Sequence, residues 1–127
     1  MQKIKGSILL VLGMIMAYSC YYEYPPQPLP IDPDQVSFNT HILPLLVTKC
    51  STPQCHDGTK APNLLADQAY NSLRSGGYLN LTYPEQSLLY VSIDQGVGGI
   101  IMPPSGELSQ LDKDLFLVWM AKGAPND

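Results

Sequence analysis

Apolar side chains recur at helical spacing in the first part of the chain that carries a clear pattern, segment 37–49. One stripe on that segment consists of Phe38, Ile42, Leu45 and Leu46. Ser37 precedes the stripe and suits the N-cap position, where its hydroxyl can accept a hydrogen bond from a free backbone amide. Pro44 lies inside the segment, so the predicted helix must kink or become locally irregular there.

The last periodic segment has the clearest pattern in the chain. Its apolar stripe consists of Leu111, Leu115, Val118 and Trp119. Ser109 is predicted to cap this helix, with Asp112 close to the positive end of the helix dipole. Gly123 is predicted to end the helix, because glycine adopts the backbone conformation that a helix C-terminus requires.

Two shorter helices are predicted between these segments. One is capped by Asp67 and runs through Leu73, where the pair 76–77 of glycines stops it. The other has Pro84 in its first turn, and its apolar side consists of Leu88, Leu89 and Val91. No alternating pattern of useful strand length occurs, so the chain is predicted to be all-α, with three to five short helices and long irregular loops.

Composition narrows the possible classes of protein. The chain has 127 residues, 12 of them proline and 10 glycine, and its net charge is −4. This length allows one domain and excludes a multi-domain enzyme. The absence of a basic cluster argues against nucleic-acid binding. A core built from a few short helices is small, and small domains often need a disulfide, a metal or a cofactor for stability.

The N-terminal segment is predicted to be an export signal. Lys3 and Lys5 precede an apolar run over 8–17, which is shorter than the roughly 20 residues needed to span a bilayer. Cys20 follows Ser19 as in a bacterial lipobox, so we expect 1–19 to be a lipoprotein signal peptide and Cys20 to carry lipid. Ordinary secretion with a free Cys20 is the alternative.

A proline-rich stretch follows the expected cleavage site. It contains Pro25, Pro26, Pro28, Pro30 and Pro33. Such a stretch favours extended polyproline geometry, so we expect 20–36 to be a stiff tether that holds the domain off a membrane. The expected location is outside the cytoplasm, on a membrane that faces the bacterial periplasm or the cell surface.

Two thiols and an imidazole follow the first predicted helix, at Cys50, Cys55 and His56. One interpretation is covalent haem, with two thioethers and the adjacent histidine as the proximal iron ligand. The spacing is C-x4-C-H, not the usual C-x2-C-H, so the two added residues must bulge outward, which Pro53 favours. The alternatives are a Cys50–Cys55 disulfide, or a zinc site completed by His41.

A methionine in a stiff context supports the haem interpretation. Met102 lies 46 positions after His56 and directly before Pro103 and Pro104. A mono-haem cytochrome needs a second axial ligand, and a methionine thioether is a common choice. The alternative is a buried core methionine, which is the interpretation we favour for Met120 in the last predicted helix.

These motifs together resemble the small class I-type c-type cytochromes of bacteria, in particular a lipoprotein subgroup with an expanded haem motif. The resemblance covers residues 37–124 and includes a helix with an internal proline, Pro-Asn-Leu at 62–64, Ser-Leu-Leu-Tyr at 87–90, Met-Pro-Pro at 102–104 and Gly-Ala at 123–124. It implies a cytochrome c-like domain over 37–127, wrapped around one haem c. It also implies attachment through Cys50 and Cys55, with His56 and Met102 as axial ligands.

The resemblance implies an electron carrier between respiratory or dehydrogenase partners, and not an enzyme. Without Lys3 and Lys5 the chain keeps 5 basic and 11 acidic residues, a net charge of −6, which favours redox partners with a basic docking face. Trp119 is expected to pack on the haem, with plain helix packing as the alternative. The competing functions are a structural or metal-binding lipoprotein and a haem-based gas sensor from which Met102 dissociates.

Overall fold

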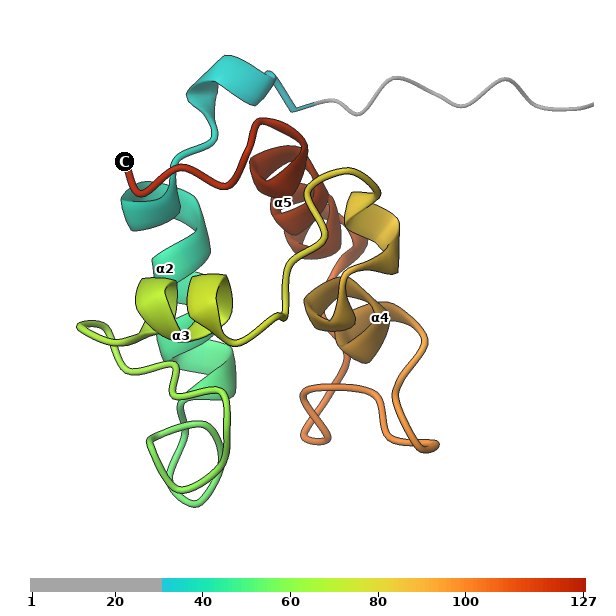
Figure 1. Cartoon of the computed structure of the whole chain (residues 1–127). Coiled ribbons are helices and arrows are strands. Elements are labelled where there is room, and N and C mark those ends of the chain that lie inside the picture. The colour runs from blue at the N-terminus through green and yellow to red at the C-terminus, as the bar shows by residue number, and fades with distance from the viewer. Residues whose placement is uncertain (1–30) are drawn as a thin grey trace, which may run out of the picture.

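The structure is a computed structural model that describes residues 31–127, so the expected signal peptide and Cys20 lie outside the described residues. Within 31–127 the chain is helical and has no strand, which confirms the all-α prediction; an isolated bridge joins Val97 and Ile100 (Figure 1). The elements are η1 (Pro33–Gln35), η2 (Phe38–Ile42), α2 (Leu43–Leu45), η3 (Leu46–Cys50), α3 (Ala69–Ser75), η4 (Pro84–Gln86), α4 (Leu88–Asp94) and α5 (Gln110–Ala121).

The first predicted helix forms and continues through its internal proline. The elements η2, α2 and η3 follow one another without a gap, and Ser37 caps them by accepting a hydrogen bond from the Thr40 amide at 3.1 Å. The turns on either side of Pro44 are π-helical: the Leu43 amide donates to the Phe38 carbonyl. The irregularity expected at the proline therefore takes the form of two wide turns, and not of a break.

The last helix is capped as predicted, but its buried face differs from the predicted stripe. The Asp112 amide donates to the Ser109 hydroxyl at 3.2 Å. Leu111 is 56% exposed, so its place in the core stripe was wrong. The buried residues of α5 are Lys113, Asp114, Phe116, Val118, Trp119 and Met120.

The buried face of α5 includes two charged residues because both have partners. The Lys113 ammonium lies 3.1 Å from the Asp94 carboxylate of α4, and the Gln110 amide donates to Asp114 at 2.8 Å. Burial and the nearby carboxylates raise the pKa of Tyr90 on α4, which is itself buried. A paired charge can be buried at this helix contact, and a hydropathy pattern does not reveal such pairing.

The two middle helices differ from the prediction in where they begin and in their continuity. Helix α3 begins at Ala69 and has no side-chain cap, so Asp67 does not cap it; it ends at Gly76 as expected. The segment from Pro84 is divided, because Ser87 is extended and separates η4 from α4. The Ser87 hydroxyl is used elsewhere: it accepts from the Asn80 amide at 2.7 Å.

The folded domain begins earlier than the predicted boundary at residue 37. Val36 is 1% exposed and belongs to the core, and Asp32 caps the 3-10 turn η1 that precedes it. The Lys122 ammonium donates to the Val36 carbonyl and fixes this segment against the end of α5. Residues 32–36, which were expected to belong to the tether 20–36, are therefore part of the folded domain.

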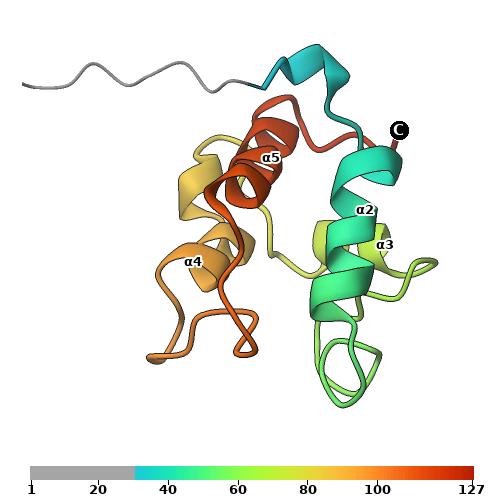
Figure 2. The same ribbon diagram turned by 180° about the vertical axis from the view of Figure 1, so that it is seen from behind.

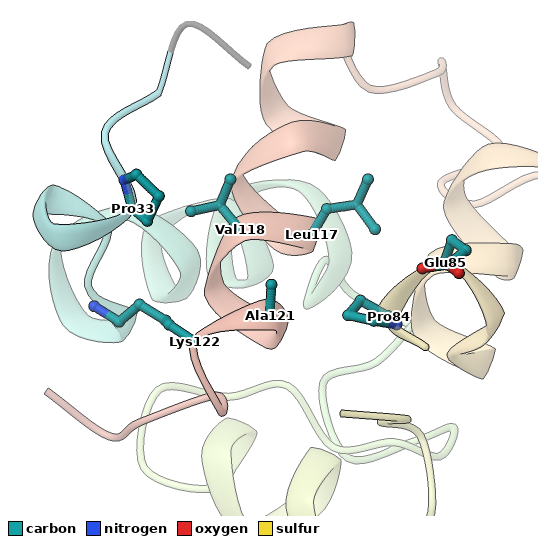
Figure 3. Close-up of a pocket in the computed structure, with 7 residues that line it drawn as sticks. All are labelled: Pro33, Pro84, Glu85, Leu117, Val118, Ala121 and Lys122. Atoms are coloured by element: carbon teal, nitrogen blue, oxygen red, sulfur yellow. The ribbon is translucent and has the colours of Figure 1, made fainter. Parts of the chain in front are cut away.

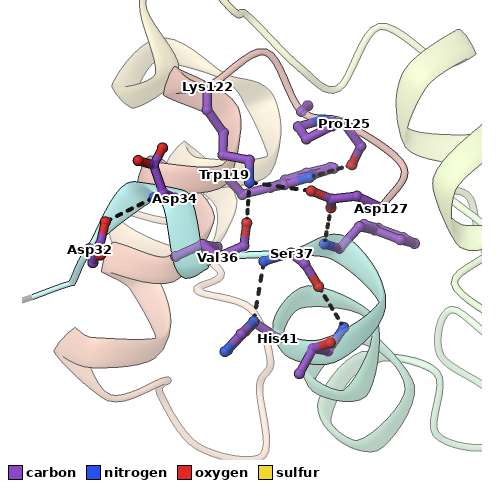
Figure 4. A network of polar contacts seen from close by, with 12 residues as sticks. Asp32, Asp34, Val36, Ser37, His41, Trp119, Lys122, Pro125 and Asp127 are labelled. Atoms are coloured by element: carbon purple, nitrogen blue, oxygen red, sulfur yellow. Dashed lines mark hydrogen bonds and ion pairs between the residues drawn. The ribbon is translucent and has the colours of Figure 1, made fainter.

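Residues close to the C-terminus hold the start of the first helix (Figure 4). The Asp127 side chain accepts from the Phe38 amide at 2.8 Å, and its main-chain oxygen accepts from the Asn39 amide, also at 2.8 Å. Nearby, the Trp119 indole nitrogen donates to the Pro125 carbonyl at 2.9 Å. The two bonds to Asp127 satisfy helix N-terminal amides that no residue of the same helix can satisfy.

Helix α5 joins two parts of the domain, because it packs against both η2 and α4. In the two opposite views, the helix 38–50 and α3 lie on one side, α4 lies on the other, and their loops extend from the same end of the molecule (Figures 1 and 2). Among residues 31–127 no helix is long and apolar enough to cross a membrane.

Candidate functional site

A cavity of about 590 Å³ lies between the two parts of the domain. One wall comes from the end of the first helix and the loop after it, and includes Cys50, Cys55 and His56. The opposite wall comes from α4 and from the loop that carries Met102. The structure thus brings together four of the residues predicted from the sequence, although Met102 is 46 positions from His56.

The cysteine loop places its two added residues on the outside. The Cys55 amide donates to the Thr52 carbonyl at 3.0 Å and closes a tight turn. Pro53 and Gln54 form the tip of this turn and are exposed, in agreement with the expected outward bulge. Cys55 and His56 remain half-buried and line the cavity.

His56 is held in a defined orientation. Its Nδ1 atom lies 3.1 Å from the Pro62 carbonyl oxygen, and its backbone amide donates to the Cys50 carbonyl at 3.2 Å. A carbonyl only accepts, so the ring must donate from Nδ1, and in the neutral tautomer Nε2 then keeps a free lone pair. A hydrogen bond of this kind is the usual support of a metal-ligating histidine. Pro62-Asn63-Leu64 is part of the sequence resemblance, but its sequence does not indicate that the Pro62 carbonyl orients the imidazole.

The two cavity thiols are free, and they form no disulfide. Burial, with a smaller contribution from Cys55, raises the pKa of Cys50 to about 11. Cys50 is therefore a neutral thiol near pH 7, which suits a partly apolar wall.

The structure does not bring His41 to the cavity wall that holds Cys50, Cys55 and His56. His41 lies nine positions before Cys50 on the first helix. It accepts a hydrogen bond from the Ser37 amide at 3.2 Å and does not line the cavity. In the described part of the chain, no group of three or more histidine, cysteine, aspartate or glutamate side chains is arranged to hold a metal ion. His41 therefore has a structural role at the helix start.

Met102 and Met120 have different environments. Met102 is half-buried in the cavity wall, and its amide donates to the Ser92 carbonyl of α4 at 2.8 Å. Met120 is completely buried in the helix core, as expected for a packing residue. The Ser92 carbonyl was not foreseen, because the sequence does not indicate which residue of α4 meets the loop.

The remaining walls of the cavity are largely apolar. Leu64, Leu89 and Ile93 line it and are buried in the core. Leu88 and Val97 also line it, yet they are 45% and 49% exposed. A flat apolar group between the walls would cover both side chains, and a volume of about 590 Å³ lies within the range of roughly 300–1,000 Å³ that is typical of cofactor sites.

Trp119, which was expected to pack on the haem, lies outside the lining of this cavity. Its indole is fully buried, but it is not part of the cavity lining. The ring packs on Phe38, with centroids 5.3 Å apart, and its nitrogen is bonded to the Pro125 carbonyl. Trp119 therefore joins the last helix to the first, which is the packing alternative considered from the sequence.

A second hollow of about 530 Å³ lies along α5 (Figure 3). Its lining consists of Pro33, Pro84, Glu85, Leu117, Val118, Ala121 and Lys122. It contains no thiol, imidazole or thioether, so the ligating chemistry of the described residues gathers in the first cavity.

The first cavity combines two thiols and an oriented imidazole on one wall with a thioether on the other. This set of donors suits a planar, apolar, metal-containing group that is bound from both faces. No protein-family model matches the chain, and neither a curated protein nor a solved structure matches it significantly. The residues of the cavity are therefore what indicates a function for this chain.

Proposed function

We propose that this chain is a mono-haem c-type cytochrome that carries single electrons. The observation that supports the proposal is the convergence of Cys50, Cys55 and His56 on one cavity wall with Met102 on the other. The orientation of His56 by the Pro62 carbonyl is independent support, because it leaves Nε2 free as a ligand. The exposed apolar side chains of the cavity would also become covered.

Each residue of the cavity then has a separate task. The Cys50 and Cys55 thiols would hold a haem covalently: each S–H would add across one vinyl double bond, which gives a thioether without any oxidant or reductant. His56 Nε2 and the Met102 sulfur would be the two protein ligands of its iron, each from its own wall of the cavity. When bound, the haem iron supplies one-electron transfer at a potential that the axial ligands help to set.

Ligation from both walls favours a carrier over an enzyme. If His56 and Met102 both bind, no position remains for a substrate, so we propose transfer of electrons without bond chemistry. A gas sensor would need the Met102 sulfur to dissociate from the iron. The hydrogen bond from the Met102 amide to the Ser92 carbonyl instead holds the Met102 backbone against α4.

The proposed partners are redox proteins with a basic docking face. The expected mature chain carries a net charge of −6, which attracts such a face and makes docking sensitive to salt. Lys49 and Lys60 line the cavity itself, so the acidic docking contacts must come from outside that lining.

The proposal is tested by producing the full chain in a bacterial host able to mature c-type cytochromes. We expect a visible spectrum of a six-coordinate haem, a mass increase of one haem, and no loss of colour on extraction with acidic acetone. Colourless protein with a Cys50–Cys55 disulfide would support the structural lipoprotein instead. Ready binding of carbon monoxide by the reduced protein would support the sensor.

Anchoring of the carrier is proposed to depend on lipid at Cys20. Cys20→Ser is expected to move the protein from the membrane fraction to the soluble exported fraction and to leave its visible spectrum unchanged. One acyl chain gives only weak membrane binding, whereas a lipoprotein cysteine carries several, so the shift should be nearly complete. Native protein recovered in solution with a free Cys20 thiol would favour ordinary secretion.

A further inference from the structure

The cysteine loop is held by a carboxylate that the proposed ligand set does not use. Asp57 Oδ2 accepts a hydrogen bond from the Gln54 amide at 3.2 Å, and Oδ1 accepts from the Thr59 amide at 3.1 Å. Hydrogen bonds from Thr59, with a smaller contribution from Gln54, lower the pKa of Asp57. Asp57 directly follows His56, so its side chain connects the exposed tip of the loop to the backbone beside His56. Asp57 does not line the cavity.

The tip of the loop needs such support because its backbone is strained. Gln54 has a φ of 69°, a left-handed conformation that residues other than glycine rarely adopt. Proline in second place, a positive φ in third place and the bond between the Thr52 carbonyl and the Cys55 amide are features of a type II turn. Glycine is the preferred third residue of that turn, and here glutamine replaces it.

We propose that Asp57 is a positioning residue that fixes the separation of the Cys50 and Cys55 thiols before a haem is attached. This inference rests on the proposed function. A four-residue gap between the cysteines allows more conformations than a two-residue gap, so more backbone entropy is lost when both thiols meet one ring. Asp57 reduces that cost by holding the tip in its turn in advance.

The backbone beside Asp57 is held firmly, so Asp57 can hold the tip of the loop in place. His56 is bonded through its ring to the Pro62 carbonyl and through its amide to the Cys50 carbonyl. The Leu64 amide donates to the His56 carbonyl at 2.7 Å. These three hydrogen bonds fix the backbone next to Asp57. The Asp57 carboxylate in turn fixes the position of the Gln54 amide.

Asp57→Ala tests the inference in the full chain matured in the same host. The fraction of chains with two thioethers, measured by intact mass and by the pyridine haemochrome band, is expected to fall at least about threefold, because a hydrogen bond to a charged acceptor is lost. The band should also move to the red, since a missing thioether leaves one vinyl group unsaturated.

The matched control is Asp67→Ala. It removes the same charge from an exposed position whose carboxylate accepts a hydrogen bond from the Gln68 side chain, and it should leave haem attachment unchanged. Adding Gln54→Gly to Asp57→Ala should restore more than half of the lost attachment, because glycine adopts a positive φ without strain. Full attachment in Asp57→Ala, or no recovery in the double variant, would overturn the inference.

A readout without haem separates this inference from the proposed function. In the haem-free chain, hydrogen exchange of the Gln54 amide is expected to be about fivefold faster in Asp57→Ala than in the unchanged protein. If the unchanged protein takes up no haem, the proposed function fails, and the exchange rate still reports on the loop. An unaltered exchange rate would contradict the positioning role of Asp57.

Discussion

His56→Ala is expected to abolish stable haem incorporation. His56 is the ligand on the cysteine wall, and its ring is oriented for ligation by the Pro62 carbonyl at 3.1 Å. Loss of a residue that merely orients a metal ligand costs roughly 10–100-fold in metal affinity, so loss of the ligand itself should cost at least as much. The measurement is haem per polypeptide chain, from intact mass and the visible spectrum.

Met102→Leu provides a graded comparison for this result. Leucine keeps the volume and the apolar character of the cavity wall, so both thioethers should form, while the spectrum loses the sulfur-to-iron band and the potential falls. Met120→Leu is the matched control, because Met120 lies in the helix core and away from the cavity. If Met120→Leu changes the spectrum and Met102→Leu does not, the assignment of the sixth ligand is wrong.

Trp119→Ala is expected to destabilise the domain strongly, whether or not haem is present. Trp119 is fully buried, packs on Phe38 and donates to the Pro125 carbonyl. Replacing a buried tryptophan with alanine costs about 3–5 kcal/mol, a large part of the roughly 5–15 kcal/mol that stabilises a typical domain. Urea unfolding followed by far-ultraviolet circular dichroism gives the change in free energy.

Trp119→Phe separates packing from hydrogen bonding at the same site. Phenylalanine keeps an aromatic ring against Phe38 and loses the indole donor, so the cost should be about 1 kcal/mol. The opposite result is an unchanged free energy of unfolding of the haem-free Trp119→Ala chain together with an altered haem spectrum. That result would favour packing of Trp119 on the haem.

The residues of the candidate site could be predicted from the sequence because ligand chemistry requires particular side chains. Cys50, Cys55, His56 and Met102 stand out because thiols, imidazole and a proline-flanked thioether are rare, and the structure places all four on one cavity. The capping residues Ser37 and Ser109 were equally clear, since short-range hydrogen bonds at helix ends depend on local sequence.

The features that could not be predicted depend on contacts between distant residues. Leu111 fits an apolar stripe, yet α5 is rotated so that Lys113 is buried against Asp94, a carboxylate 19 positions away. Val36 was assigned to the tether because it follows a proline-rich stretch, although it packs in the core. Single-chain periodicity does not include such tertiary contacts, so it does not predict them.

The packing of α5 against both η2 and α4 has a consequence for local stability. The walls of the cavity belong to two parts of the domain that α5 joins, one carrying the cysteine loop and the other carrying Met102. Each part is then a candidate for separate, sub-global opening, with amide exchange rates that differ on the two sides. A ligand bound to both walls would couple the two opening reactions. The amides of both loops would then become protected from hydrogen exchange together.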